Sequence, residues 1–334
     1  MLTRGDKMRK LFSLISAVAF TFFSIFSLNA AEKWDMPMAY AASNFHSQMG
    51  VKFAEAVKVA TGGEIDITVH PGGSLFKGDE IKKAVQTGQA PIGERLLSAH
   101  ENESLLFGGD SIPFLATSYE DSDKLWKYLR PAMEKKLEEQ GLVLLYGIPW
   151  PAQGLYFKKE VNSIADTKGV KFRSYSGATA RIAELMGMLP VQVEAAELSQ
   201  ALATGVAESF VSSGATGYDR KVWEHLTHFY EVNAWLPRNY VFVNKKAWDK
   251  LSKQNQNIIR GIAAMTEAAG TARSEALSGW YLTQLAANGM KVQVAKGQFR
   301  TDLEKIGKTM SDEWIAKAGP EGKKVVDGFR SEKK

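Results

Sequence analysis

The chain has 334 residues, of which 45% are hydrophobic and 24% are charged, a composition typical of a soluble protein with an ample core. It contains no cysteine, which excludes disulfides, thiolate catalysis and cysteine-bound zinc. The formal net charge is +5, but residues 1–30 carry four of the 42 basic and one of the 37 acidic residues, so the rest of the chain has a charge of only +2. This near-neutral balance argues against a nucleic-acid-binding protein.

The N-terminus has the pattern of a secretory signal peptide. Four basic residues precede an apolar run from Leu11 to Leu28, and the small residues of Asn29-Ala30-Ala31 follow it. Four serines and a threonine interrupt the run, which argues against a permanent membrane anchor. We therefore expect residues 1–31 to be a cleaved signal peptide, Ala31 or Glu32 to begin the mature chain, and the mature protein to be periplasmic.

Strand and helix patterns alternate along the rest of the chain. Ser43 or Asn44 can cap a helix whose apolar positions recur at three- and four-residue spacing from Phe45 to Ala60. Strands are expected over residues 34–40, 65–69, 141–146, 170–173, 191–193, 209–212 and 240–244. Helices are expected over residues 78–87, 119–139, 179–186 and 198–204, with one long helix across 251–288. This order predicts an α/β fold of mixed sheets flanked by helices.

The absence of a single linker suggests two lobes between which the chain crosses more than once. Lobe I is expected over residues 32–150, with a segment returning to it from about residue 240. Lobe II is expected over 151–239. The helical part, 240–334, is expected to be shared, with its long helix bridging the lobes.

Enzyme motifs are poorly represented. Ser74 and Lys77 match the S-x-x-K motif of serine acyltransferases, but its companion motifs are missing. His225 and His228 are three residues apart near an expected helix, yet no Glu completes a zinc-binding H-E-x-x-H pattern. We expect no catalytic residues, no metal site and no cofactor, although scattered carboxylates that ligate a metal leave no sequence pattern.

Side chains suited to binding a small ligand are concentrated between residues 149 and 181. They are Trp150, Gln153, Tyr156, Arg173 and Tyr175. Aromatic walls with a few polar groups are typical of small-ligand pockets. Arg173 ends an apolar strand, where its planar fork can grip a carboxylate or, alternatively, form a surface ion pair.

Three segments give the chain a resemblance to the DctP-type solute receptors of TRAP (tripartite ATP-independent periplasmic) transporters. They are Asp166–Arg173, matching the D-L-K-G-x-K-x-R strand, Glu197–Val206, matching the E-x-y-x-A-L-q-t-G-v helix, and Val243–Trp248. The resemblance spans about residues 32–320. It implies a two-lobed, periplasmic-binding-protein-like fold in which Arg173 pairs with the ligand carboxylate. It also implies delivery of the ligand to the small and large membrane permease subunits, a transient contact with membrane proteins.

The sequence departs from this family at several candidate binding positions. Ser212 and Ser213 stand where many relatives have Asn-Pro, and Ser212 aligns with the Asn that often contacts the ligand. Glu94 and Arg95 stand where relatives often have small or apolar residues. Arg95 could neutralise a second carboxylate and Glu94 could accept a hydrogen bond from a ligand hydroxyl or amine, or the two could pair with each other.

Three further polar residues lie where ligand contact is expected. Asn44 and His46 fall in the first strand–helix turn, where polar ligand groups can meet a helix N-terminus. Asn239 precedes the strand that returns to lobe I. The aromatic neighbours of Arg173 favour a monocarboxylate such as a 2-oxo, hydroxy, cyclic or aromatic acid, whereas a dicarboxylate is favoured if Arg95 also faces the cleft. A secreted enzyme with Glu94 as general base, or a sensory scaffold that presents the ligand to a histidine kinase, is the alternative.

Overall fold

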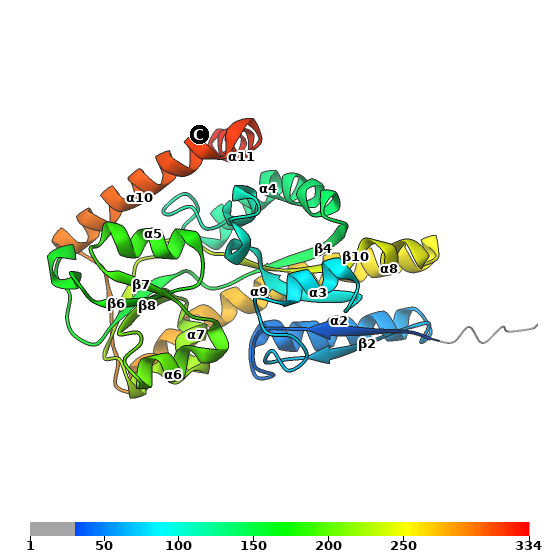
Figure 1. The fold of residues 1–334 in the computed structure, drawn as a ribbon, viewed down its shortest axis with the longest axis horizontal. Helices are drawn as coiled ribbons and strands as arrows, with labels where there is room; N and C mark the ends of the chain where they lie inside the picture. Colours follow the sequence, from blue (N-terminus) through cyan, green and yellow to red (C-terminus); the bar gives the residue numbers. More distant parts are fainter. Residues whose placement is uncertain (1–30, 334) are drawn as a thin grey trace, which may run out of the picture.

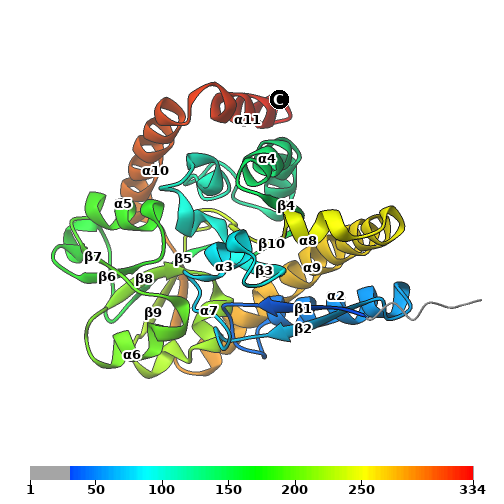
Figure 2. The same ribbon diagram turned by 45° about the vertical axis from the view of Figure 1, so that its right-hand side comes forward.

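The computed structural model describes residues 31–333, so all of the predicted signal peptide except Ala31 lies outside the described residues. Two groups of strands lie side by side, each flanked by helices (Figures 1 and 2). No helix among residues 31–333 combines the length and apolar content needed to cross a bilayer.

Lobe I is built on two small sheets. In the first, β1 (Glu32–Pro37) and β2 (Ile65–His70) pair in parallel. In the second, β10 (Arg238–Asn244) lies antiparallel between β3 (Ile92–Leu96) and β4 (Leu142–Pro149). The central strand β10 comes from late in the sequence, about 90 residues after β4.

Lobe II contains a six-stranded mixed sheet in the order β11-β9-β5-β8-β6-β7. Only β5 runs antiparallel to its neighbours β8 and β9, and the other pairs are parallel. The strands are β5 (Gly154–Phe157), β6 (Lys171–Ser174), β7 (Leu189–Gln192), β8 (Ser209–Ser212), β9 (His228–Glu231) and β11 (Lys291–Val294).

Helices cover these sheets. The α-helices are α2 (Phe45–Ala60), α3 (Ile81–Thr87), α4 (Tyr119–Glu139), α5 (Gly177–Leu185), α6 (Leu198–Ala203), α7 (Gly214–Asp219), α8 (Lys245–Lys250), α9 (Lys253–Ala287), α10 (Gly297–Lys317) and α11 (Gly319–Ser331). Short 3₁₀ turns are η1 (Leu97–His100), η2 (Leu105–Gly108), η3 (Ile164–Thr167), η4 (Ala195–Glu197) and η5 (Val222–Glu224).

The expected long helix is α9, whose 35 residues span roughly 50 Å. It packs on α2 and β4 of lobe I and on α7 and β11 of lobe II, so it bridges the lobes as predicted (Figure 1). The helix expected over 119–139 and the strand expected over 209–212 have the same bounds as α4 and β8. The helix expected from residue 78 begins instead at Ile81, and α8 was not expected.

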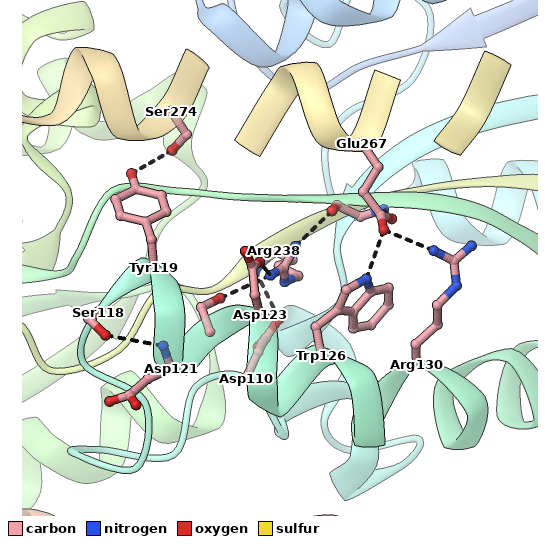
Figure 3. A network of polar contacts seen from close by, with 12 residues as sticks. Asp110, Ser118, Tyr119, Asp121, Asp123, Trp126, Arg130, Arg238, Glu267 and Ser274 are labelled. Carbon is pink, nitrogen blue, oxygen red and sulfur yellow. Dashed lines mark hydrogen bonds and ion pairs between the residues drawn. The ribbon is translucent and has the colours of Figure 1, made fainter. Parts of the chain in front are cut away.

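A polar network fixes α9 and β10 to α4 in lobe I (Figure 3). The carboxylate of Glu267 on α9 accepts hydrogen bonds from Trp126 Nε1, Arg130 Nη1 and the backbone N–H of Gly147 at 3.0, 2.9 and 2.7 Å. Arg238 at the start of β10 is buried and donates to the carboxylate of Asp123 at 2.8 Å. Because buried polar groups need such partners, this network fixes how α9 lies on lobe I.

In addition to the bridging helix α9, two neighbouring segments, 150–153 and 232–237, carry the chain between the lobes. Backbone hydrogen bonds join them, from Trp150 to Pro237 at 2.8 Å, from Gln153 to Trp235 at 3.0 Å and from Ala234 to Gln153 at 3.1 Å. These paired crossings form the hinge region referred to below, and residues on both of them face the space between the lobes.

Candidate ligand-binding site

A cavity lies between the lobes beside the hinge region and contains about 440 Å³ of empty space, its open mouth included. Residues from both lobes and from the hinge region line it. They are Tyr40, Arg95, Leu96, Ala99, Trp150, Gln153, Arg173, Tyr175, Glu194, Ala195, Ser212, Thr216 and Pro237. Of the residues proposed from sequence, the structure therefore brings six to the cavity: Arg95, Trp150, Gln153, Arg173, Tyr175 and Ser212.

Arg173 is held in place from behind and faces the cavity. It is the third residue of β6 and is only 3% exposed. Its Nε donates to the carbonyl of Val193 at 2.8 Å, and its guanidinium lies 5.1 Å from the ring centre of Tyr175. Its two Nη groups have no hydrogen-bonded partner among residues 31–333. Burial lowers the pKa of Arg173, but an arginine stays protonated in proteins, so the cavity contains an uncompensated pair of charged donors.

Arg95 also faces the cavity, but its charge is already matched. Its Nη1 and Nη2 donate to Oε2 and Oε1 of Glu194 at 3.0 and 2.9 Å. Arg95 belongs to β3 of lobe I, whereas Glu194 follows β7 in lobe II, so this two-bonded ion pair crosses the cleft. Burial raises the pKa of Glu194, but attraction by Arg95 and its hydrogen bonds outweigh burial and hold that pKa below its usual value.

Other cavity residues use their polar atoms within the protein. Trp150 Nε1 donates to Asn239 Oδ1 at 2.8 Å, and the Tyr175 hydroxyl donates to Gln153 Oε1 at 3.1 Å. Gln153 Nε2 donates to the carbonyl of Pro151 at 3.1 Å. These side chains therefore provide shape and aromatic surface more than free hydrogen-bonding groups.

Three hydroxyl groups in the lining remain available. The hydroxyl groups of Tyr40, Ser212 and Thr216 form no hydrogen bond with another side chain among residues 31–333. Burial raises the pKa of Tyr40 to about 12, so its hydroxyl stays protonated and can donate. A ligand in the cavity would therefore meet two charged Nη groups and these three neutral hydroxyls.

Glu94, His46 and Asn239 lie behind Trp150 and do not line the cavity. The amide of Asn239 donates to Glu94 Oε1 at 2.8 Å, and Glu94 Oε2 is 3.9 Å from Nδ1 of His46. Burial raises the pKa of Glu94 to about 8, although the Asn239 bond lowers it, and burial lowers the pKa of His46 well below its usual value. The alternative that Glu94 pairs with Arg95 is wrong, because successive side chains of β3 point to opposite faces.

Asn44, Tyr156 and Ser213 also lie outside the lining. Asn44 caps α2 by accepting from the backbone N–H of His46 at 2.9 Å. The hydroxyl of Tyr156 donates to the carbonyl of Ser213 at 2.8 Å, and its ring stacks on Phe210 within the core of lobe II. The structure thus gives Tyr156 and Ser213 roles in packing and in capping α7.

Sequence reasoning missed the other lining residues, which are the polar Tyr40, Glu194 and Thr216 and the apolar Leu96, Ala99, Ala195 and Pro237. Tyr40 lies four residues before Asn44 and Thr216 three residues after Ser213, but nothing in their local sequence pattern marks them as ligand-binding residues. Glu194 pairs with a residue 99 positions away, a relation that no local pattern contains. Pro237 was detectable only as a neighbour of Asn239 in the segment that returns to lobe I.

The pair of histidines is not arranged as a metal site. His228 lies in β9, with Nδ1 2.7 Å from the hydroxyl of Thr227. His225 follows the short turn η5. Within residues 31–333, no group of three or more His, Asp or Glu side chains is placed to hold a metal ion.

Comparison with known proteins gives close matches to solved solute receptors. A marine metagenome TRAP solute-binding protein specific for pyroglutamate, from an unidentified microbe and solved with co-purified pyroglutamate, is 60% identical. It superposes with a TM-score of 0.89, covering 90% of this chain and 99% of that chain. A Bordetella pertussis extracytoplasmic solute receptor binding pyroglutamic acid is 45% identical, with a TM-score of 0.88 over 90% of this chain and 100% of that one. These matches confirm the expected two-lobed fold.

Similarity extends to a more distant curated protein and to a family model. A monocarboxylate 2-oxoacid-binding periplasmic protein of Nostoc sp. is 25% identical over 79% of this chain and 74% of that protein. The model of the DctP family, bacterial extracellular solute-binding protein family 7, matches residues 38–317. With most of its length matched and its cavity between two hinged lobes, this chain belongs to the DctP family and is a solute receptor of the TRAP type.

Proposed function

We propose that this receptor captures a cyclic monocarboxylate, pyroglutamate first of all, in the cavity beside the hinge region. The observation that carries the proposal is the pair of unpartnered Nη groups of Arg173, buried between the lobes. An arginine fork binds a carboxylate through two parallel charge-assisted hydrogen bonds.

The other residues that line the cavity suit a ligand with a small, partly apolar ring. Pyroglutamate has a carboxylate, a lactam N–H, a lactam carbonyl and a short apolar ring edge. The hydroxyls of Tyr40, Ser212 and Thr216 can serve the lactam, and Trp150 and Tyr175 provide aromatic surface for the ring. The 60% identical receptor that was solved with pyroglutamate favours the same ligand for this chain.

Isothermal titration calorimetry tests the ligand assignment. The protein is unfolded, dialysed and refolded to remove any co-purified ligand, and then titrated with L-pyroglutamate, L-proline, pyruvate and succinate. We expect affinity for pyroglutamate of about micromolar or better, the range that two or three charge-assisted bonds and ring contacts can give. Proline is the sharpest control because it keeps the ring and the carboxylate but replaces the lactam carbonyl with CH₂ and carries a charged amine.

Other outcomes would change the assignment. Binding of pyruvate in preference to pyroglutamate would favour a 2-oxo acid, the ligand class of the Nostoc relative. Binding of succinate alone would contradict a monocarboxylate ligand.

The same proposal includes export and delivery. The mature receptor, beginning at Ala31 or Glu32 after signal cleavage, would hand its ligand to the small and large permease subunits and leave it chemically unchanged. Mass spectrometry of the exported protein checks the cleavage position. Mass spectrometry of pyroglutamate after long incubation checks for turnover, and conversion of the ligand would contradict a receptor without enzymatic activity.

A further inference from the structure

Glu194 approaches the cavity from lobe II and meets Arg95 from lobe I. Both Nη groups of Arg95 donate to its carboxylate, at 3.0 and 2.9 Å, and the Nε of Arg95 is buried without a partner among residues 31–333. Glu194 therefore engages both Nη groups of Arg95 and balances its charge while this ion pair is in place.

The glycine at position 78 leaves room for the Arg95–Glu194 ion pair. A Cβ added to Gly78 would lie 2.6 Å from Oε2 of Glu194 and 2.7 Å from Nη1 of Arg95. Such distances are closer than non-bonded atoms tolerate, so a larger residue at position 78 would displace the pair. The backbone at residue 78, Arg95 and Glu194 thus form one close contact at the edge of the cavity.

The formal charges of the lining residues then determine which anions fit. Two arginines and one glutamate line the cavity, so the described lining has a net charge of +1. A ligand with one carboxylate neutralises it. A second carboxylate near Arg95 would face the carboxylate of Glu194, and it would have to displace that side chain to reach the guanidinium.

We propose that Glu194 determines the charge selectivity of the receptor: by occupying Arg95 it leaves Arg173 as the cation open to ligands, so the site accepts monocarboxylates and rejects dicarboxylates. The inference rests on the proposed function, since it takes Arg173 as the carboxylate-binding residue. Glu194 acts here through Arg95 and is a positioning residue.

The pair also joins the two lobes, so a change in affinity alone would not separate selectivity from closure. Glu101 provides the matched control. Its carboxylate in lobe I accepts a hydrogen bond from the backbone N–H of Ala178 on α5 in lobe II at 3.1 Å. This contact crosses the cleft as the Arg95–Glu194 pair does, but Glu101 does not line the ligand cavity.

The test measures the affinities of L-pyroglutamate and of glutarate, a five-carbon dicarboxylate, by calorimetry for four proteins: wild type, Glu194→Gln, Glu101→Gln and the double variant Arg95→Gln/Glu194→Gln. The quantity of interest is the ratio of the two affinities, because loss of a cross-lobe contact lowers both affinities together. In wild type we expect pyroglutamate to bind at least about a hundredfold more tightly than glutarate.

Glu194→Gln should weaken pyroglutamate binding and strengthen glutarate binding by roughly tenfold or more, because Arg95 becomes a second free cation. The double variant should lose this gain for glutarate, since it has only Arg173 again. Glu101→Gln should weaken both ligands by the same factor and leave their ratio unchanged.

The results separate this inference from the ligand assignment. If Glu194→Gln lowers both affinities equally, as Glu101→Gln is expected to do, Glu194 only holds the lobes together and the inference is overturned. Tight binding of glutarate by wild type would also overturn it. If wild type instead binds another monocarboxylate and not pyroglutamate, the ligand assignment fails and the same ratio is measured with that acid.

Should Glu194→Gln fold poorly, Arg95→Gln alone gives an independent test. It leaves Glu194 uncompensated beside Arg173 and brings the net charge of the lining to zero. Pyroglutamate should then bind more weakly to this single variant than to the double variant. Equal affinities for the two would contradict a role for the charge of Glu194.

Discussion

Asn44 donates a hydrogen bond from Nδ2 to Oδ2 of Asp219 at 2.6 Å, and the two residues belong to opposite lobes. Asn44 caps α2 with its other side-chain atom, while Asp219 is the last residue of α7. The Arg95–Glu194 pair and the Glu101–Ala178 bond likewise join the lobes around the cavity. The described conformation is thus a closed one.

A charge swap at this contact should control closure. Asn44→Asp keeps an oxygen that can cap α2 but places two carboxylates together, so it should weaken ligand binding by roughly tenfold through repulsion in the closed form. The double variant Asn44→Asp/Asp219→Asn restores a donor opposite an acceptor and should recover most of the affinity. Calorimetry with pyroglutamate measures both, and failure of the double variant to recover would show that Asn44 acts in some way other than through Asp219.

Removal of the Arg173 fork should abolish most of the ligand affinity. Arg173→Ala should cost on the order of 2–4 kcal/mol of binding free energy, because it leaves a carboxylate buried without its charged partner. Arg173→Lys should recover only part of this loss, since an ammonium cannot form two parallel bonds. Calorimetry measures the affinities, and urea unfolding of the ligand-free variants serves as the control for folding. An unchanged affinity in Arg173→Ala would refute the assigned role.

The buried carboxyl of Glu94 should make stability depend on pH. Burial raises its pKa to about 8, so the folded state holds a proton that the unfolded state releases near pH 4.5. The folded state therefore binds more protons between these values, and the free energy of unfolding should fall as pH rises from about 4.5 to 8. Burial lowers the pKa of His46, which faces Glu94, well below its usual value.

Glu94→Gln should remove most of this pH dependence, because a glutamine can still accept from Asn239 and does not ionise. Relative to wild type, the variant should gain on the order of 3 kcal/mol between pH 5 and pH 8. Urea unfolding of both proteins at the two pH values measures the gain. The slope that remains should come partly from Glu101, whose pKa burial raises to about 7. Parallel pH profiles for wild type and variant would contradict this account.

Local patterns predicted the parts of the fold and site that neighbours in sequence determine. The apolar strand that ends at Arg173 and the cap of α2 at Asn44 both depend on residues within a few positions, and both are present in the structure. Ser212 was predicted from the family resemblance, in which it aligns with an Asn that often contacts the ligand, and it lines the cavity.

Contacts between residues far apart in the sequence determine the parts of the site that local sequence patterns do not predict. Tyr156 and Tyr175 are both aromatic residues near strand ends, but only Tyr175 reaches the cavity. Tyr156 lies inside β5, directly opposite Phe210 of β8, and its hydroxyl occupies the space that the absent side chain of Gly217 leaves, 2.3 Å from where a Cβ would be. The partner of Arg95 was likewise decided by how the lobes close, which brings Glu194 to it in place of its neighbour Glu94.

Two glycines on the bridging helix α9 should respond oppositely to the same substitution. A Cβ on Gly270 would lie 2.3 Å from Cδ1 and 2.7 Å from Cγ1 of Ile148 on β4, whereas a Cβ on Gly261 would meet nothing within 4 Å. Gly261→Ala should therefore stabilise the protein by roughly 0.5–1 kcal/mol through helix propensity alone. Gly270→Ala gains the same propensity but forces α9 away from Ile148, and overpacking of this kind costs about 1–3 kcal/mol.

Urea unfolding of the two variants measures the difference in stability. Since Ile148 lies two residues before the hinge region, Gly270→Ala should also weaken pyroglutamate binding, whereas Gly261→Ala should leave it unchanged. Equal stabilisation by both substitutions would show that α9 does not pack on β4 as closely as described.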